Sequence, residues 1–219
     1  MHIPDSILQL SPAVLVGGYA VTAATTAYAL YRINREEDPR ELIPRAALLT
    51  AAFFVASRIS IPLPPVTVHL VLNGLLGVIL GWYAAPSILI GLILQALIFQ
   101  HGGVTTLGVN FVIMGVPSLL AFGVFQFVRA RPQLPRGWLA LWSFLAGGIG
   151  VLLSAAIFYV VVLSSNSLAV DPVAERNITI IFVLSHVPVA IIEGLLTVYL
   201  VTYLRRVRPE FLPYVGQSS

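Results

Sequence analysis

The chain has 219 residues, of which 58% are hydrophobic and only 10% are charged, and its formal net charge is +3 at pH 7. Charged residues make up about a quarter of a soluble globular domain, so this composition, with a mean hydropathy of +0.94, excludes a soluble protein. Cysteine and lysine are both missing from the sequence, which excludes disulfides, thiolate metal sites and the lysine-containing phosphate loop of many ATPases.

The apolar runs predict an all-α integral membrane protein, with one membrane domain over residues 1–219 and a compact bundle of about seven transmembrane helices. The run after Ser11 and Pro12 is long enough for a span and has no basic residue before it, which favours a membrane helix over a signal peptide. Aromatic and turn residues at 81–86 interrupt a long apolar stretch and predict a hairpin of two helices. The predicted spans cover about residues 12–31, 44–61, 66–82, 86–99, 107–128, 138–163 and 178–204.

Arginine-rich segments follow the first, fifth and seventh predicted spans. The positive-inside rule places such segments in the cytoplasm, and seven spans satisfy the rule for all three. The N-terminus is then outside and the C-terminus cytoplasmic, and the loop of residues 100–110 lies on the outer side. Because the arginines are confined to loops between apolar runs, they indicate topology and no nucleic-acid partner.

All four histidines fall at the outer ends of spans or in outer loops: His2, His69, His101 and His186. The terminal amine of Met1 with the backbone nitrogen and imidazole of His2 can wrap one ion in fused chelate rings. A fourth nitrogen from His69 gives an all-nitrogen planar set of the kind that Ni(II) or Cu(II) favours, whereas zinc prefers a tetrahedron. Pro4 makes residues 1–10 a stiff, extended segment that we expect to insert at the outer face. The competing interpretation of His2 is a disordered surface residue.

Two further sites in the chain leave alternatives open. His186 and Glu193 are seven residues apart and share one face of the last span, where they form either a functional pair or a structural contact between helices. His101 either orients the N-terminal segment or makes an ordinary loop hydrogen bond, and we expect no direct ligation by it. A proton-coupled secondary transporter using Glu193 and His186 is an alternative function. An intramembrane hydrolase is a weaker one, because no GxSxG motif accompanies the histidines.

Several motifs, in their order along the chain, resemble the CbiM/NikM family of substrate-binding membrane components of energy-coupling-factor transporters for cobalt and nickel. They are residues 1–5 (MHIPD), 68–77 (VHLVLNGLLG), 80–81 (LG), 101–110 (HGGVTTLGVN) and 186–194 (HVPVAIIEG). The position after Asp5 is commonly glycine in that family and is Ser6 here.

This resemblance implies that Met1, His2 and His69 bind the transported nickel or cobalt ion. It assigns supporting roles to five further residues of the motifs: Asp5, His101, Asn110, His186 and Glu193. It further implies a non-enzymatic subunit in a prokaryotic inner membrane, without a cofactor or an ATPase site. The implied partners are a membrane coupling (T) subunit, cytoplasmic ATPase subunits and, in some systems, a small accessory membrane subunit. The sequence does not decide between nickel and cobalt, since both ions accept the same nitrogen donors.

Overall fold

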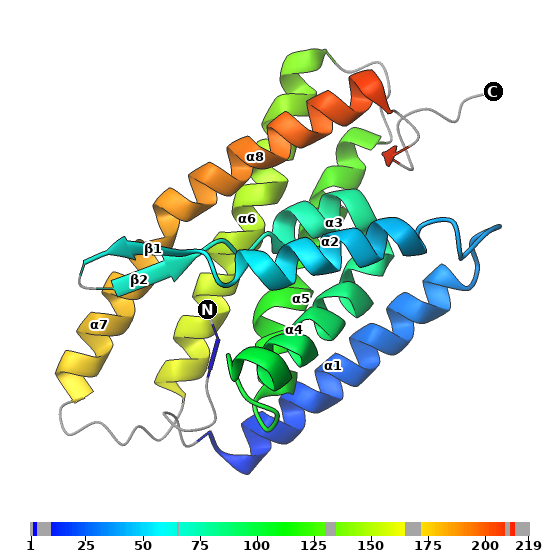
Figure 1. Cartoon of the computed structure of the whole chain (residues 1–219). Coiled ribbons are helices and arrows are strands. Elements are labelled where there is room, and N and C mark those ends of the chain that lie inside the picture. The colour runs from blue at the N-terminus through cyan, green and yellow to red at the C-terminus, as the bar shows by residue number, and fades with distance from the viewer. Residues whose placement is uncertain are drawn as a thin grey trace.

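The computed structural model describes residues 2–3, 10–64, 66–129, 135–164, 172–208 and 211–212, and it is almost entirely helical (Figure 1). Five apolar segments are long enough to cross a membrane: Pro12–Ile33, Asn73–Phe99, Leu107–Phe127, Gly137–Leu163 and Arg176–Val207. A shorter apolar helix, α2 (Ile43–Ala56), lies beside them. The predicted all-α membrane fold is confirmed, whereas the number of seven spans stays a prediction.

The first helix, α1 (Pro12–Ile33), begins where the sequence predicts. The side chain of Ser11 caps it by accepting a hydrogen bond from the Val14 amide at 3.4 Å, and Pro12 occupies the first turn, where its missing N–H is not needed. A charged loop then leads into α2. Tyr83 holds this loop by donating a hydrogen bond to the carbonyl of Pro39 at 2.7 Å.

The second and third predicted spans are both shorter than expected. Helix α2 ends at Ala56, and residues assigned to spans 44–61 and 66–82 instead form the antiparallel strands β1 (Ser60–Leu63) and β2 (Val66–His69). Prolines within this stretch cannot continue a helix, and the β-branched residues on either side of them favour extended backbone. The register pairs Ser60 with His69, so this hairpin carries His69 at its end.

Helix α3 (Asn73–Leu80) leads through a 3-10 turn, η1 (Gly81–Tyr83), into α4 (Ala84–Phe99). Gly77 lies against Ser118 and Gly81 against Phe122, so α3 runs parallel to α5 (Leu107–Arg129). Helix α4 runs back toward the end at which α3 begins, because His101 after α4 lies near His69 before α3. The segment Asn73–Phe99 therefore reverses direction at Gly81, whose φ of +58° suits glycine. That its two helices are separate membrane spans stays a prediction.

Helix α6 (Arg136–Leu163) packs closely along α8 (His186–Val207) through glycines. The last predicted span, residues 178–204, is divided between α7 (Pro172–Leu184) and α8, with a break at Ser185. Pro188 accounts for this break, since it lacks an N–H for the preceding turn and its ring crowds the carbonyl there.

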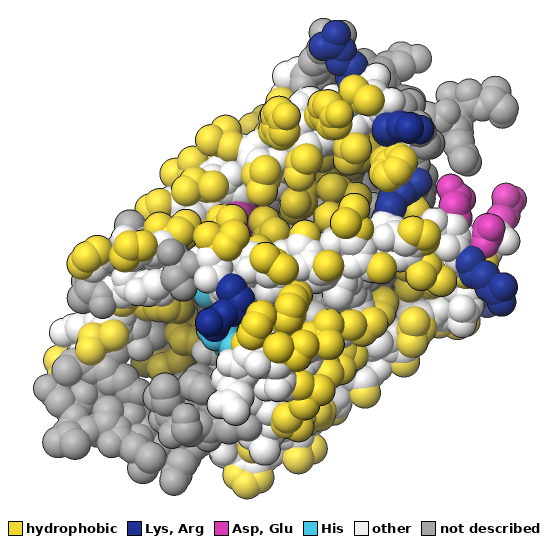
Figure 2. All heavy atoms as spheres, viewed as in Figure 1, with side chains coloured by type: hydrophobic (Ala, Val, Ile, Leu, Met, Phe, Trp, Pro, Cys, Tyr) yellow, Lys and Arg dark blue, Asp and Glu magenta, His cyan; other side chains and the backbone are white. Residues whose placement is uncertain are grey.

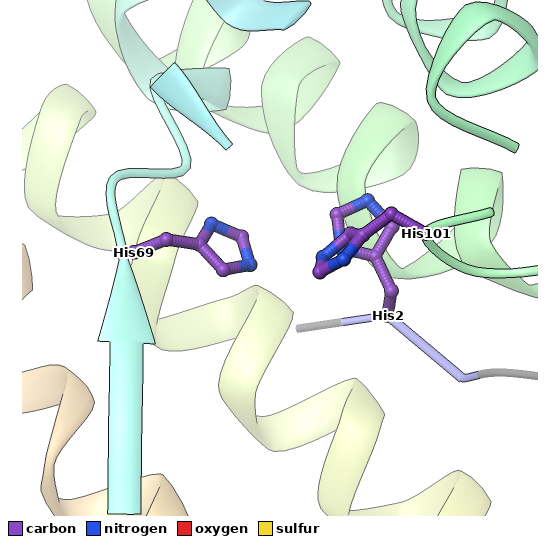
Figure 3. A group of neighbouring side chains, drawn as sticks. All are labelled: His2, His69 and His101. Carbon is purple, nitrogen blue, oxygen red and sulfur yellow. The ribbon is translucent and has the colours of Figure 1, made fainter. Parts of the chain in front are cut away.

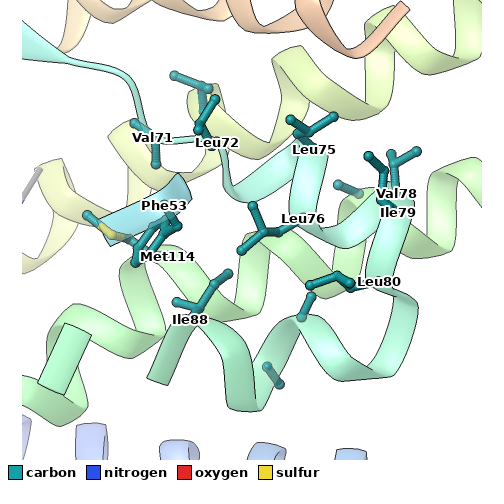
Figure 4. Close-up of a cluster of buried hydrophobic side chains, with 14 of the residues drawn as sticks. Phe53, Val71, Leu72, Leu75, Leu76, Val78, Ile79, Leu80, Ile88 and Met114 are labelled. Carbon is teal, nitrogen blue, oxygen red and sulfur yellow. The ribbon is translucent and has the colours of Figure 1, made fainter. Parts of the chain in front are cut away.

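The short helix α3 lies at the centre of the bundle, and every residue from Asn73 to Leu80 is buried (Figure 4). The amide of Asn73 donates hydrogen bonds to the carbonyls of Met114 and Gly150 and to the Ser154 hydroxyl, at 3.1, 3.2 and 2.7 Å. These bonds join α3 to both α5 and α6. The short non-helical segment of residues 70–72 that precedes α3 thus enters the bundle from one end, where the histidines lie.

Candidate metal centre

Three imidazoles from distant parts of the sequence meet at one end of the bundle (Figure 3). His2 comes from the N-terminal segment, His69 from the end of β2 and His101 from the loop after α4. One nitrogen from each ring lies within 4.8 Å of the others. The ring centroids of His2 are 5.4 Å from His69 and 4.3 Å from His101. Histidine nitrogens at this separation can share a transition-metal ion.

The backbone of Ile3 fixes the N-terminal segment against α5. The Ile3 N–H donates to Asn110 Oδ1 at 2.8 Å, and Asn110 Nδ2 donates back to the Ile3 carbonyl at 3.1 Å. Thr106 Oγ1 donates to the same carbonyl at 2.7 Å, and the Ile3 side chain is fully buried. Asn110 thus pairs with Ile3 as a neighbouring strand would, which satisfies both backbone groups of a residue removed from water.

Gln95 sets the orientation and tautomer of His2. Gln95 Nε2 donates to the Phe53 carbonyl at 3.4 Å, which turns Gln95 Oε1 toward His2 Nε2 at 2.7 Å. An amide oxygen only accepts, so His2 Nε2 carries the proton and Nδ1 carries the lone pair. In the part of the chain that the structure describes, this Nδ1 is buried and has no hydrogen-bond partner. A buried lone pair beside two other imidazoles indicates a ligand position.

His69 is held in the complementary way. Its Nδ1 donates a hydrogen bond to the Leu70 carbonyl at 2.9 Å. Because Nδ1 carries the proton, the lone pair of the ring is on Nε2. Figure 3 shows this ring extending from the end of the strand toward the rings of His2 and His101. A hydrogen bond from one ring nitrogen to a backbone carbonyl is the usual support for a metal-binding histidine.

The loop after α4 closes over the N-terminal segment, as the resemblance implies. The His101 N–H donates to the Gln95 carbonyl at 3.1 Å, so one residue orients both His2 and the start of this loop. Gly102 has a φ of +85°, and a Cβ there would lie 3.0 Å from Asn110 Nδ2 and 3.6 Å from His2 Cδ2. Only glycine lets the loop approach the segment this closely.

The surroundings of the three rings favour neutral imidazole. Burial lowers the pKa of His2 well below its ordinary value, and burial lowers the pKa of His69 to about 2. Burial also lowers the pKa of His101, and the positive charge of Arg58 acts in the same direction. Figure 2 shows an arginine side chain beside the histidines on the molecular surface. Neutral imidazole is the form that binds a metal ion.

Of the remaining predicted site residues, His186 and Glu193 lie outside the cluster. His186 is buried and its Nδ1 donates to the Phe182 carbonyl at 2.7 Å. Glu193 is buried on α8 and accepts hydrogen bonds from the backbone of the segment that follows His69. Met1 and Asp5 are outside the described residues, so their predicted roles stay predictions.

Sequence reasoning missed Gln95 and Thr106, both of which contact the N-terminal segment. A signal for Gln95 was available, because it is the one strongly polar residue within the apolar run of α4. A polar side chain inside a membrane span ordinarily faces a polar partner within the protein. Thr106 gave no comparable signal, since it follows another threonine in a polar loop.

The fold and the cluster define a class of protein: a helical membrane protein with a histidine site of the transition-metal kind. The structure matches the crystal structure of a truncated transition metal transporter with a TM-score of 0.76 and 25% sequence identity, covering 94% of this chain and 98% of that one.

The family follows from two further comparisons. The model of the CbiM family, described as the cobalt uptake substrate-specific transmembrane region, matches residues 2–211. Cobalt transport protein CbiM 1 of Pelobacter propionicus is 34% identical over 97% of this chain and 94% of its own length. Cobalt transport protein CbiM of Sorangium cellulosum is 30% identical over 97% and 94%. The chain belongs to the CbiM family.

Proposed function

We propose that this chain is the substrate-specificity component of an energy-coupling-factor transporter and captures Ni(II) or Co(II) at the outer face. Its proposed ligands are the Met1 amine, the backbone nitrogen and Nδ1 of His2, and Nε2 of His69. The family membership supports a role in metal uptake, and the names of the relatives support cobalt or a related ion.

The observation that carries the proposal is the tautomer of His2. Only Nδ1 lies near enough to the His2 backbone nitrogen to close a small chelate ring, because Nε2 is on the far side of the imidazole. Gln95 occupies Nε2 and leaves Nδ1 buried without a partner among the described residues. The segment is therefore held in the form that the chelate requires before the ion arrives, which reduces the ordering cost of binding.

His69 supports the fourth ligand position, and His101 has a different proposed role. The lone pair of His69 is on Nε2, which follows from the hydrogen bond of Nδ1 to Leu70. His101 lies closer to His2 than His69 does, yet its backbone is tied to Gln95. We assign His101 to enclosing and orienting the N-terminal segment, which is one of the two roles that the sequence leaves open.

Transport itself requires energy from other subunits in this proposal. A membrane coupling subunit and cytoplasmic ATPase subunits, with a small accessory membrane subunit in some systems, reorient the loaded protein so that the ion is released inward. The location is the inner membrane of a prokaryotic cell, with the N-terminus outside. The proton-coupled alternative gains no support from Glu193, whose two oxygens both accept hydrogen bonds from backbone amides.

The test is to measure Ni(II) and Co(II) affinity for purified protein with a native N-terminus, for His2→Ala, for His69→Ala, and for a chain with one extra residue before Met1. We expect the extension and His2→Ala to abolish binding and His69→Ala to weaken it at least tenfold, because losing a ligand should cost at least as much as losing the hydrogen-bonded support of a ligand. Unchanged binding by the extended chain would refute the chelate. Transport that continues without ATPase partners would refute the proposed energy source.

A further inference from the structure

The carboxylate of Glu193 contacts the chain directly after the proposed ligand His69. One oxygen of Glu193 accepts a hydrogen bond from the Val71 amide, and the other accepts one from the Leu72 amide at 2.8 Å. Glu193 is 1% exposed and belongs to α8, more than a hundred residues further along the sequence. A buried residue of the last helix thus binds the short segment that carries His69 into the bundle.

This segment lies between β2 and α3, so neither element holds the Val71 and Leu72 amides in regular secondary structure. Leu72 precedes α3 and has a φ of 56° and a ψ of 5°, a left-handed conformation that is unfavourable for a bulky side chain. No side chain from the segment itself caps α3. Val71 and Leu72 are both buried, so their amides need a protein acceptor. Glu193 provides it for both, and such strained backbone persists only where its surroundings fix it.

Glu193 is in turn fixed by close helix packing. A Cβ at Gly147 of α6 would lie 2.9 Å from the Glu193 carbonyl, and a Cβ at the adjacent Gly194 would lie 2.7 Å from the Phe144 ring. Thr197, one turn further along α8, donates to the Glu193 carbonyl at 2.7 Å. The packing of α6 against α8 therefore fixes Glu193, and Glu193 in turn fixes the segment that follows His69.

We propose that Glu193 is the positioning residue for the metal ligand His69. This inference rests on the proposed function, because it presumes that His69 binds the ion. Glu193 holds Val71 and Leu72 in the one conformation that directs the His69 ring toward His2. It touches neither the ion nor the imidazole, and its loss acts on metal binding only through His69.

The test is a double-mutant cycle between Glu193→Gln and His69→Ala, with Ni(II) affinity and thermal unfolding measured for each variant. Glutamine has the same size as glutamate, but its amide nitrogen faces a backbone N–H and cannot accept. We expect Glu193→Gln to weaken Ni(II) binding at least tenfold in the native background and to have no further effect in the His69→Ala background. Thr50→Val, which removes a hydrogen bond to the Ala46 carbonyl within α2, should leave the affinity unchanged.

Three results would overturn the inference. Native affinity in Glu193→Gln would show that His69 needs no such support. Equal losses in both backgrounds would show that Glu193 acts elsewhere. An unaffected His69→Ala protein would remove the proposed function together with the inference, whereas the first two results leave the function standing. If Glu193→Gln does not fold, Glu193→Asp replaces it in the same cycle, with a smaller loss expected in the native background alone and equal losses in both backgrounds again contradicting the proposal.

Discussion

At the scale of single residues, the hydrogen bond made by one nitrogen of each imidazole determines whether the other nitrogen has a lone pair for a metal ion. Gln95 accepts from His2 Nε2, and the Leu70 carbonyl accepts from His69 Nδ1. The two rings therefore present opposite nitrogens, Nδ1 for the chelate from His2 and Nε2 for the more distant His69. Histidine content alone does not predict this difference, because the tautomer depends on partners supplied by other elements.

Gln95→Leu removes the acceptor that holds the tautomer of His2 and leaves the Nε2 proton without a partner. The ring is then free to carry its proton on Nδ1, so we expect Ni(II) affinity to fall about 10- to 100-fold, as for other residues that support metal ligands. Isothermal titration with purified protein measures this loss. Gln126→Leu, the same substitution near the far end of α5, is the matched control. Equal affinities for the two variants would contradict the role of Gln95.

The pH dependence of metal binding follows from the lowered pKa values. His69, with a pKa of about 2, is neutral at both about pH 7.5 and about pH 5.5, although an unperturbed histidine with a pKa of about 6.5 is mostly protonated at the lower pH. The factor by which His69→Ala weakens Ni(II) binding should therefore be the same at both pH values. The remaining loss of affinity in acid is expected from the terminal amine, with an ordinary pKa of about 7.7–8.0, and from the amide.

Metal titrations of the native protein and of His69→Ala at the two pH values measure this factor. A factor that shrinks toward one in acid would mean that His69 takes up a proton there. Binding that does not change with pH in the native protein would instead exclude the amine and amide as ligands.

At the scale of elements, the site depends on short non-helical segments between the long helices. The β1–β2 hairpin and residues 70–72 replace helix that hydrophobicity predicts, and they bring His69 back toward the bundle. Hydropathy does not distinguish a buried strand from a short stretch of membrane helix, since both are continuous apolar runs. The prolines and β-branched residues gave the signal for extended structure, and the length of the run outweighed it.

Among these elements, the N-terminal segment should matter most for Ni(II) affinity, which should fall when its contacts with α5 are lost. Asn110→Leu removes both hydrogen bonds between Asn110 and the Ile3 backbone. His2 and Ile3 are then no longer held in place and must be ordered when the ion binds. Ordering costs about 1–2 kcal/mol for each residue, which predicts a loss of Ni(II) affinity of at least tenfold. Equilibrium binding of Ni(II) tests this, with Asn177→Leu on the exposed surface of α7 as the control. Native affinity in Asn110→Leu would exclude this docking role.

At the scale of the whole molecule, most of the arginines lie at the opposite end of the bundle from the cluster of His2, His69 and His101. Arg32 stacks on Trp82 at the turn between α3 and α4, and Arg45 stacks on Phe211 beyond α8, at 4.9 and 4.1 Å. Helix α8 also ends there, with Arg205 and Arg206 in its last turn. The arginine-rich segments that follow α1 and end α8 thus share one end of the bundle, and Figure 2 shows acidic side chains at that end as well.

Which end of the bundle faces the outside of the cell can be tested by labelling single cysteines, since the native chain has no cysteine. Thr67→Cys lies on the exposed hairpin beside the metal centre, and Gly137→Cys lies at the arginine end, where a Cβ meets no neighbour within 4 Å. A membrane-impermeant maleimide should label Thr67→Cys in intact cells and Gly137→Cys only after permeabilisation. The reverse pattern would place the metal centre inside and contradict uptake from the outer face.

The sequence by itself determined the membrane class, the run of apolar helices, the reversal at Gly81 and the family motifs, because hydrophobicity and glycine conformation are properties of local sequence. It also identified the histidines as candidate ligands, because imidazole is the commonest metal ligand in proteins. The tertiary structure decided which atoms face one another: Asn110 on Ile3, Gln95 on His2, and Glu193 on the segment after His69. These contacts join residues about a hundred positions apart, and only the packing of the helices determines such pairs.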